Sequence, residues 1–287
     1  MAGNGMPEAL ARLIGPQPDG PVTEVRLRAE RPVEIRTLSG SRLLPGVLAR
    51  EALSRLLDEL AAHSLYAWQE QLRQGFFTLP DGSRVGVTGR FVVEDGRVRG
   101  LTHIGSACLR LAHEVPGCAA PLSPLLCPGG RPESALILSP PGLGKTTLLR
   151  DIARCFSLGI HGFSPCQVGI ADERGELAAC RQGIPSLEVG PRTDVCDGCP
   201  KALALPMLVR TMGSRVLVTD ELGGREDARA VLAAHRCGAA VVASAHAADL
   251  REARGRPGLS SLLSARAFSR VVELGDGVGE IRRVVAL

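Results

Sequence analysis

A glycine-rich loop, set between a short apolar run and an amphipathic segment, constrains the fold more than any other part of this sequence. The apolar run covers residues 135–138, the loop covers 139–146 (Ser-Pro-Pro-Gly-Leu-Gly-Lys-Thr), and apolar residues follow at helical spacing over 147–154. Strand, loop and helix in this order are the context that a phosphate-binding loop requires. Gly142 and Gly144 let the backbone N–H groups turn toward a phosphate, and the helix N-terminus adds partial positive charge.

The residues expected to contact a nucleotide belong to the loop and to the first helical turn: Ser139, Pro140, Pro141, Gly142, Leu143, Gly144, Lys145, Thr146 and Thr147. Lys145 is expected to act as a catalytic cation on the β- and γ-phosphates of ATP, and Thr146 to ligate Mg²⁺. Ser139 stands where the pattern G-x-x-x-x-G-K-[ST] has its first glycine, a position that only opens the loop. The alternative, an ordinary Gly/Pro turn before a helix, is disfavoured by the strand and helix that flank the motif.

Two apolar segments further along the chain end in pairs of acidic residues. Residues 215–219 precede Asp220 and Glu221. After a phosphate-binding loop such a strand is typical of a Walker B motif, so we expect Asp220 to hold Mg²⁺, through water, and Glu221 to polarise the attacking water. An earlier strand ends in Asp172 and Glu173, and we expect Glu173 to assist Glu221 as a second catalytic carboxylate.

A third strand, predicted at 239–244, leads to His246. In a doubly wound sheet the ligand lies at the carboxyl edge of the strands. We expect His246 at that edge to hydrogen-bond the γ-phosphate and to report its hydrolysis. The alternative is a structural histidine, which is the commoner role of a single histidine.

A change of pattern along the chain predicts two domains and the fold class α/β. We expect a flexible segment at 1–20, a smaller N-terminal α+β domain at 21–118, a Pro- and Gly-rich linker at 119–133 and a P-loop NTPase core at 134–287. Strands that alternate with helices favour a mostly parallel sheet in that core.

The individual elements follow from apolar spacing and turn residues. In the N-terminal part, helices are expected at 7–13, 50–63 and 65–74, and strands at 23–28, 33–36, 76–79 and 84–93. In the core, strands are expected at 135–138, 167–171, 215–219 and 239–244, followed by an antiparallel hairpin of 269–274 and 279–285.

Composition limits the kinds of partner. Aromatic residues make up 3% of the 287 residues and the net charge is +4, so we expect no specific nucleic acid, because base-stacking platforms need aromatic side chains. Nine cysteines at irregular spacings argue against a disulfide framework. A protein that uses cytosolic ATP is expected in the cytoplasm. No apolar run reaches the ~18 residues of a membrane span, so any membrane association is expected to be peripheral, through a partner.

Several motifs together resemble a known protein family. Asp172-Glu173 and residues 245–247 resemble the aspartate and histidine boxes of the hexameric ATPases of type II and type IV secretion. The resemblance to the stage III sporulation protein AA family is closer. It rests on residues 24–28, 31–32, 64–66, 75–78, 84–89, 139–151, 172–176, 192–201 and 220–221.

This resemblance implies a RecA-like P-loop ATPase that hydrolyses ATP to ADP and phosphate with Mg²⁺. It further implies a homo-oligomer, namely a hexamer, with membrane-embedded sporulation channel proteins as partners. The implied role is to energise or assemble a secretion-like channel during endospore formation. Arg110 matches the family pattern and is expected to line the nucleotide cleft from the N-terminal side. Cys196 and His113 depart from the pattern, which has an aliphatic residue and an arginine there.

The segment 192–201 admits more than one interpretation. Arg192 is our candidate for a charge-stabilising catalytic arginine, acting in cis or across a subunit interface. The alternative is a solvated surface arginine, and Arg225 is a weaker candidate for the same role. Cys196 and Cys199 have metal-site spacing, but a structural zinc needs a second ligand pair and none is evident.

Other functions stay open at this stage. A nucleic-acid translocase or helicase could use the same core, although the few aromatic residues disfavour it. A small-molecule kinase would need an acceptor pocket, whereas the pair Asp220 and Glu221 favours water as the acceptor. A nucleotide-binding scaffold without significant hydrolysis is the third alternative.

Overall fold

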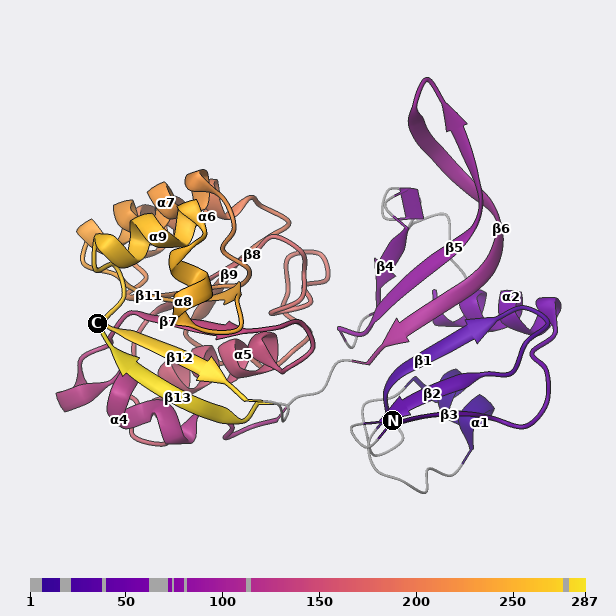
Figure 1. Ribbon diagram of the computed structural model, residues 1–287, viewed down its shortest axis with the longest axis horizontal. Helices are drawn as coiled ribbons and strands as arrows, with labels where there is room; N and C mark the ends of the chain where they lie inside the picture. The colour runs from indigo at the N-terminus through magenta and orange to yellow at the C-terminus, as the bar shows by residue number, and fades with distance from the viewer. Residues whose placement is uncertain are drawn as a thin grey trace. The chain divides into compact units, whose positions relative to one another are not determined.

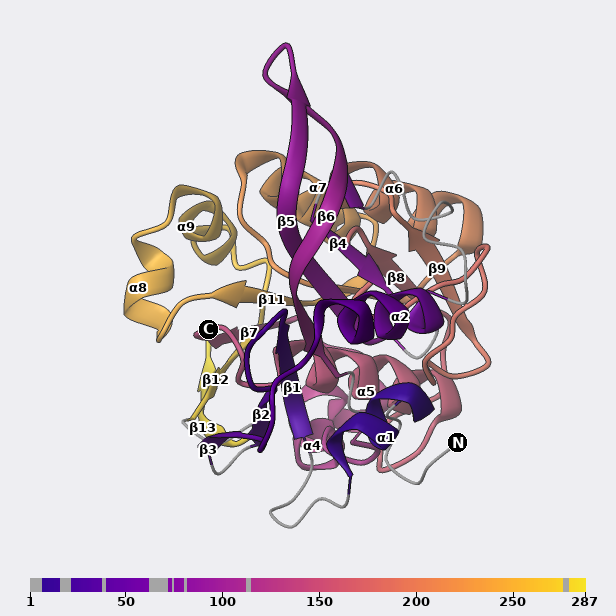
Figure 2. The ribbon, with the colours of Figure 1, turned by 90° about the vertical axis from the view of Figure 1, so that its right-hand side faces the viewer.

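The structure, a computed structural model, describes residues 7–15, 22–37, 40–61, 72–73, 75–79, 82–111, 115–275 and 279–287. The chain divides into two compact units, Met1–His113 and Glu114–Leu287, each with its own sheet (Figure 1 and Figure 2). The predicted flexible segment 1–20 and the predicted helix 65–74 lie mostly outside the described residues. Within the described ranges, none of the helices has the length and apolar character to cross a bilayer.

The first unit is built on a six-stranded antiparallel sheet in the order β3-β2-β1-β6-β5-β4. The strands predicted at 23–28, 33–36, 76–79 and 84–93 are confirmed with small shifts at their ends. Two further strands, β3 and β6, were not predicted. All four residues of β3 are exposed and lack apolar alternation, and the alternation along β6 is irregular where its register with β5 shifts. The strands are β1 (Val22–Arg28), β2 (Glu34–Thr37), β3 (Gly40–Leu43), β4 (Phe76–Thr78), β5 (Arg84–Glu94) and β6 (Arg97–Arg110).

Two helices, α1 (Glu8–Ile14) and α2 (Arg50–Leu60), complete the core of this unit. Their apolar side chains form one cluster with strand residues such as Val25 and Leu27. The helical face predicted for α2 is confirmed, since it buries Leu53, Leu56, Leu57 and Leu60.

The second unit contains a seven-stranded sheet in the order β13-β12-β7-β11-β10-β8-β9. Neighbouring strands run parallel except β12 and β13, which form the antiparallel hairpin predicted near the end of the sequence. The predicted α/β core and the N-terminal antiparallel-sheet unit are therefore confirmed. The strands are β7 (Ala135–Ser139), β8 (Val168–Asp172), β9 (Thr193–Asp197), β10 (Val216–Thr219), β11 (Ala240–His246), β12 (Arg270–Leu274) and β13 (Ile281–Ala286).

Helices cover both faces of this sheet (Figure 1). One face carries α4 (Ser123–Leu126) and α5 (Lys145–Leu158), and the other carries α6 (Lys201–Met212), α7 (Arg225–Arg236) and α9 (Pro257–Ser264), which follows α8 (Leu250–Arg254). Successive residues of a strand enter opposite cores: Val216 and Val218 face α5, and Leu217 faces the other layer. Because both faces are buried, the strands appear in the sequence as continuous apolar runs.

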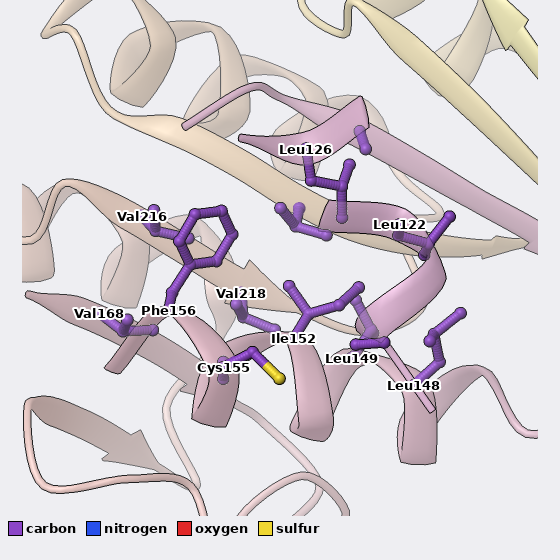
Figure 3. Packing of buried hydrophobic residues seen from close by; sticks show 14 of the residues in the cluster. Leu122, Leu126, Leu148, Leu149, Ile152, Cys155, Phe156, Val168, Val216 and Val218 are labelled. Carbon is purple, nitrogen blue, oxygen red and sulfur yellow. The ribbon is translucent and has the colours of Figure 1, made fainter. Parts of the chain in front are cut away.

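The helix α5 is fixed by its ends and by its buried face. Gly144 and Gly159 bound it in left-handed conformations that glycine adopts without strain. The ring of Phe156 meets that of Phe163 edge to face, with centroids 4.6 Å apart. Burying each large apolar side chain contributes ~1.5–3 kcal/mol. The helix buries Leu148, Leu149, Ile152 and Phe156 on the side that faces the sheet (Figure 3).

The structure corrects the predicted linker at 119–133. These residues form η2 (Ala120–Leu122), α4 and η3 (Pro128–Gly130), and they belong to the second unit. Ala119, Leu122 and Leu126 are at most 1% exposed and lie in the core beside α5. The prolines that suggested a connector stand at the first positions of these short helices, where the missing N–H costs nothing.

Phe156→Ala tests the importance of the α5 core. The substitution removes a fully buried ring, so we expect the free energy of unfolding of the second unit to fall by about 3–5 kcal/mol. Calorimetry would measure the change, with Leu158→Ala as the control, because Leu158 on the same helix is 37% exposed. Equal losses in both variants would contradict this account of the helix.

Candidate nucleotide-binding site

Four strand ends meet at one edge of the second sheet. The strands β7, β11, β10 and β8 are consecutive parallel neighbours. Their register pairs Ser139 with His246 and Thr219 with Ala171. The residues that follow, Asp220 and Asp172, therefore lie at the same edge as the glycine-rich loop, where the sequence predicted that the strand ends would meet.

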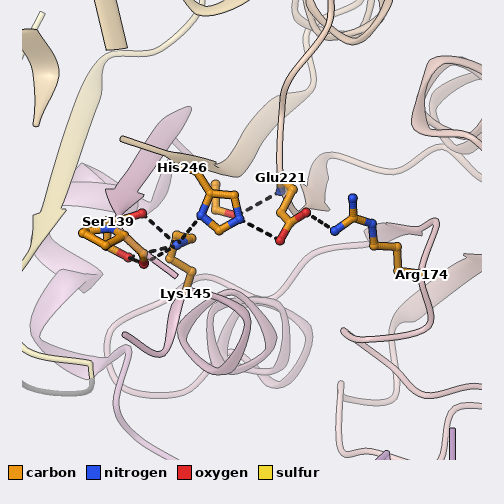
Figure 4. Close-up of polar contacts among 7 residues, drawn as sticks. Ser139, Lys145, Arg174, Glu221 and His246 are labelled. Atoms are coloured by element: carbon orange, nitrogen blue, oxygen red, sulfur yellow. Dashed lines mark hydrogen bonds and ion pairs between the residues drawn. The ribbon is translucent and has the colours of Figure 1, made fainter. Parts of the chain in front are cut away.

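Lys145 is buried and hydrogen-bonded to its own loop (Figure 4). Gly142 and Gly144 have φ angles of 82° and 83°, which curl the loop over the start of α5. The Lys145 ammonium donates to the Ser139 carbonyl at 2.8 Å, to Ser139 Oγ at 3.0 Å and to the Pro140 carbonyl at 2.8 Å. Burial lowers the pKa of Lys145 to about 8, because the interior solvates the ammonium charge poorly.

His246 bridges this lysine and the acidic strand end. Its Nδ1 lies 3.2 Å from Lys145 Nζ, and its Nε2 lies 2.9 Å from Glu221 Oε1 (Figure 4). An ammonium group can only donate and a carboxylate can only accept. Nδ1 therefore accepts from Lys145, whose three hydrogens are shared among four acceptors, and the Nε2–H donates to Glu221. The contacts thus assign one neutral tautomer to His246.

Glu221 is held from both sides. Its second carboxylate oxygen, Oε2, accepts a hydrogen bond from the Arg174 guanidinium (Figure 4). Its backbone N–H donates to Ser244 Oγ at 3.1 Å. Glu221 has a φ of 43°, a left-handed conformation that is unfavourable for a residue with a side chain. The surrounding contacts keep it there, and they orient its carboxylate toward His246.

Asp220 is buried without a donor. Its side chain is 1% exposed, and neither carboxylate oxygen has a hydrogen-bond partner among the described residues. Burial, with the charges of Asp172 and Glu176, raises the pKa of Asp220 to about 7. Such a carboxylate is costly unless a cation supplies the missing partner. Asp220 therefore fits a Mg²⁺ ligand, and Thr146 in the first turn of α5 carries a hydroxyl of the kind that P-loop sites add to it.

Asp172 organises the chain that follows β8. Its carboxylate accepts backbone N–H bonds from Glu176 at 2.9 Å, Leu177 at 3.1 Å and Ala178 at 2.8 Å. Arg150 of α5 also holds this turn, donating to the carbonyls of Leu177 and Glu176 at 2.6 and 2.8 Å. The carboxylate expected in the aspartate box thus supports residues 173–178.

Three predicted site residues do not join this group of contacts. Glu173 accepts from the Lys201 ammonium at 2.6 Å, a hydrogen bond that lowers the pKa of Glu173. Arg192 donates to the Ser157 carbonyl at 2.7 Å, near the end of α5 and about 18 Å along the helix from Lys145. Arg110 belongs to the first unit, where it lies 3.6 Å from Glu24.

Sequence reasoning missed the pairing of Arg174 with Glu221 and the support from Arg150. Arg174 directly follows the acidic pair at the end of β8, so the sequence could have predicted that it lies at the shared edge of the sheet. Arg150 lies on α5 five residues after Lys145 and is buried. Burial of an arginine indicates that its donors are satisfied inside the protein.

The fold and the loop define the P-loop class of nucleotide-binding folds. The X-ray structure of the Legionella pneumophila ATPase DotB is similar over 93% of this chain and 75% of that chain, with a TM-score of 0.54 and 16% identity. The crystal structure of the pilus retraction motor PilT with bound ADP is similar over 92% of this chain and 77% of that chain, with a TM-score of 0.55 and 17% identity. At these identities the likeness shows the fold alone.

Sequence comparison places the chain more narrowly. Stage III sporulation protein AA of Bacillus subtilis (strain 168) is 39% identical over 277 residues, which are 96% of this chain and 90% of that protein. The family described as "Sporulation stage III, protein AA" matches residues 16–285. The chain therefore belongs to this family, as the sequence motifs predicted.

Asp220→Asn tests whether the buried carboxylate lowers the free energy of unfolding. The pKa of Asp220 is raised from 3.8 to about 7, so the unfolded chain releases this proton more easily than the folded protein. The carboxyl group therefore costs stability as pH rises from about 4 to 7, by at most about 4 kcal/mol. The variant should be more stable than the parent at pH 8, with a difference that disappears near pH 3.5.

Calorimetric unfolding across this pH range, without added metal or nucleotide, would measure the difference. Asp95→Asn, at an exposed hairpin turn, is the control and should show no such pH trend. A destabilised Asp220→Asn variant at pH 8 would contradict the interpretation.

Proposed function

We propose that this protein is a Mg²⁺-dependent ATPase that hydrolyses ATP to ADP and phosphate. We further propose that turnover energises or assembles a secretion-like channel during endospore formation, as the family membership suggests. The observation that carries the catalytic part is the line of contacts from Lys145 through His246 to Glu221. It brings a phosphate-binding cation, an imidazole and a carboxylate from three elements to one place.

In the proposed reaction, water attacks the γ-phosphorus of ATP and gives its proton to Glu221. The bond between the γ-phosphorus and the bridging oxygen breaks, and ADP leaves with the bonding electrons. Lys145 and the N–H groups of the loop hold the charged phosphates throughout. His246, with Nε2–H on Glu221, keeps that carboxylate turned toward the loop.

Mg²⁺ would neutralise phosphate charge when bound. Asp220 and Thr146 would hold it, and the buried carboxylate of Asp220 without a donor supports this assignment. Glu173 is paired with Lys201, so we propose that Glu221 is the principal base and that Glu173 only supports it.

We propose that the protein assembles into a homo-oligomer, a hexamer, which works in the cytoplasm on membrane-embedded channel proteins. Arg192 is exposed and lies near the end of α5 opposite Lys145. Any phosphate that Arg192 serves therefore belongs to a neighbouring copy. The side chain of Arg110 is 70% exposed, and its expected contact with the nucleotide stays a prediction.

Two substitutions test the proposed reaction. Lys145→Ala should abolish nucleotide binding, because the phosphates lose their buried cation. Glu221→Gln should retain binding and lower the rate of phosphate release at least a hundredfold, because an amide does not accept the proton from water. Fluorescent-nucleotide titration and steady-state phosphate release would measure the two effects.

Glu226→Gln is the matched control, since Glu226 is an exposed residue in the first turn of α7. It should change neither quantity. Unchanged turnover in Glu221→Gln would show that Glu221 is not the base. An assembled parent protein that releases no phosphate would favour the alternative function, a nucleotide-binding scaffold.

Binding of ADP should weaken as pH rises above about 8. The pKa of Lys145 is about 8, so at higher pH the free protein loses the charge that the phosphates need. Binding then requires uptake of a proton, and the dissociation constant should rise by up to tenfold per pH unit. Calorimetric titration in buffers of different ionisation enthalpy would detect this proton, whereas a dissociation constant that stays flat from pH 7 to 9.5 would argue against the role of Lys145.

A further inference from the structure

We propose that Arg174 is a positioning residue for the Glu221 carboxylate in the hydrolysis proposed above, on which this assignment depends. Arg174 lies two residues after the end of β8, and its guanidinium donates to Glu221 Oε2 (Figure 4). No step of the reaction described so far uses this contact.

The two oxygens of Glu221 are held by different elements. His246 of β11 donates to Oε1 at 2.9 Å, and Arg174 donates to Oε2. One donor alone would leave the carboxylate free to turn about its last torsion, which has a broad energy profile. Two donors on opposite oxygens fix the plane of the group. Since a carboxylate offers about four lone-pair sites, acceptor capacity remains for a water molecule.

The backbone that carries Arg174 is itself held firmly. The Asp172 carboxylate binds the three N–H groups of residues 176–178. Arg150 ties the carbonyls of Glu176 and Leu177 to α5, the helix that begins at Lys145. The turn that carries Arg174 is thus hydrogen-bonded to α5, the same helix that carries Lys145. A catalytic carboxylate needs support of this kind to stay within a fraction of an ångström of its working position.

The exposure of the pair separates positioning from a structural role. The Arg174 side chain is 53% exposed and that of Glu221 is 25% exposed. Ion pairs as exposed as this one add little to stability. Loss of Arg174 should therefore leave the fold intact and act on the rate of the chemical step.

Arg174→Ala in the full chain is the test. We expect kcat for phosphate release to fall at least tenfold, while KM for ATP, the dissociation constant of ADP and the melting temperature stay close to the parent values. Arg174→Lys should restore part of kcat, because an ammonium can donate to Oε2 but lacks the planar fork of arginine. Arg256→Ala is the matched control: Arg256 pairs with Glu252 at 2.7 Å and is 46% exposed.

A second measurement places the effect on Glu221. In the Glu221→Gln background, Arg174→Ala should change the single-turnover rate less than twofold, because its target is already disabled. An equal tenfold loss in both backgrounds would overturn the proposal and put Arg174 on the substrate.

Other outcomes are equally decisive. A parent protein that releases no phosphate in any assembly state refutes the proposed function itself. An active parent with an unchanged or faster Arg174→Ala variant refutes the positioning role alone. A variant that loses ADP binding also refutes it. If Arg174→Ala fails to fold, Arg174→Lys and Arg174→Gln give the same kcat comparison, and equal kcat in those two and the parent overturns the assignment.

Discussion

Parallel pairing of four buried strands is the constraint on which the candidate site depends. β7, β11, β10 and β8 lie side by side in one direction, so the loop after β7 and the polar residues after the other three share an edge. A slip of one residue would turn each strand over and exchange the side chains of its two faces. Val216 and Val218 fill one core and the larger Leu217 fills the other, so a slip would overpack one core and leave a void in the other. Packing therefore fixes where Asp220 and Glu221 emerge.

Two charged groups at this edge are held in surroundings that disfavour their charges. The pKa of Lys145 is lowered to about 8 and that of Asp220 is raised to about 7, in each case chiefly by burial. Each group is thus drawn toward its neutral form. An anion beside Lys145 and a cation beside Asp220 would relieve both costs, which is the combination that a metal-bound nucleotide offers. The two buried charges therefore lower the stability of the free protein at the site where a ligand would bind.

Much of this arrangement could be predicted from local sequence. Apolar runs predict the strands at 135–138, 167–171, 215–219 and 239–244. Gly142, Gly144 and Lys145 predict the phosphate-binding loop. The pairing of Arg174 with Glu221 could not be predicted, because it depends on side-chain directions set by three different elements. The position of Arg192 depends on the contact between the segment before β9 and the end of α5, and no local sequence pattern predicts that contact. The prolines of 119–133 predict a linker, but the buried side chains of Leu122 and Leu126 hold this segment in the core of the second unit.

A crystal structure with Mg²⁺ and a non-hydrolysable ATP analogue would test the central claim most directly. We expect Lys145 Nζ to leave the carbonyls of its own loop and to lie about 3 Å from a phosphate oxygen, with the metal on the side of Thr146 and Asp220. Glu221 should remain beside His246. A nucleotide bound elsewhere, or a Lys145 still hydrogen-bonded to Ser139 and Pro140 beside an ordered triphosphate, would contradict it.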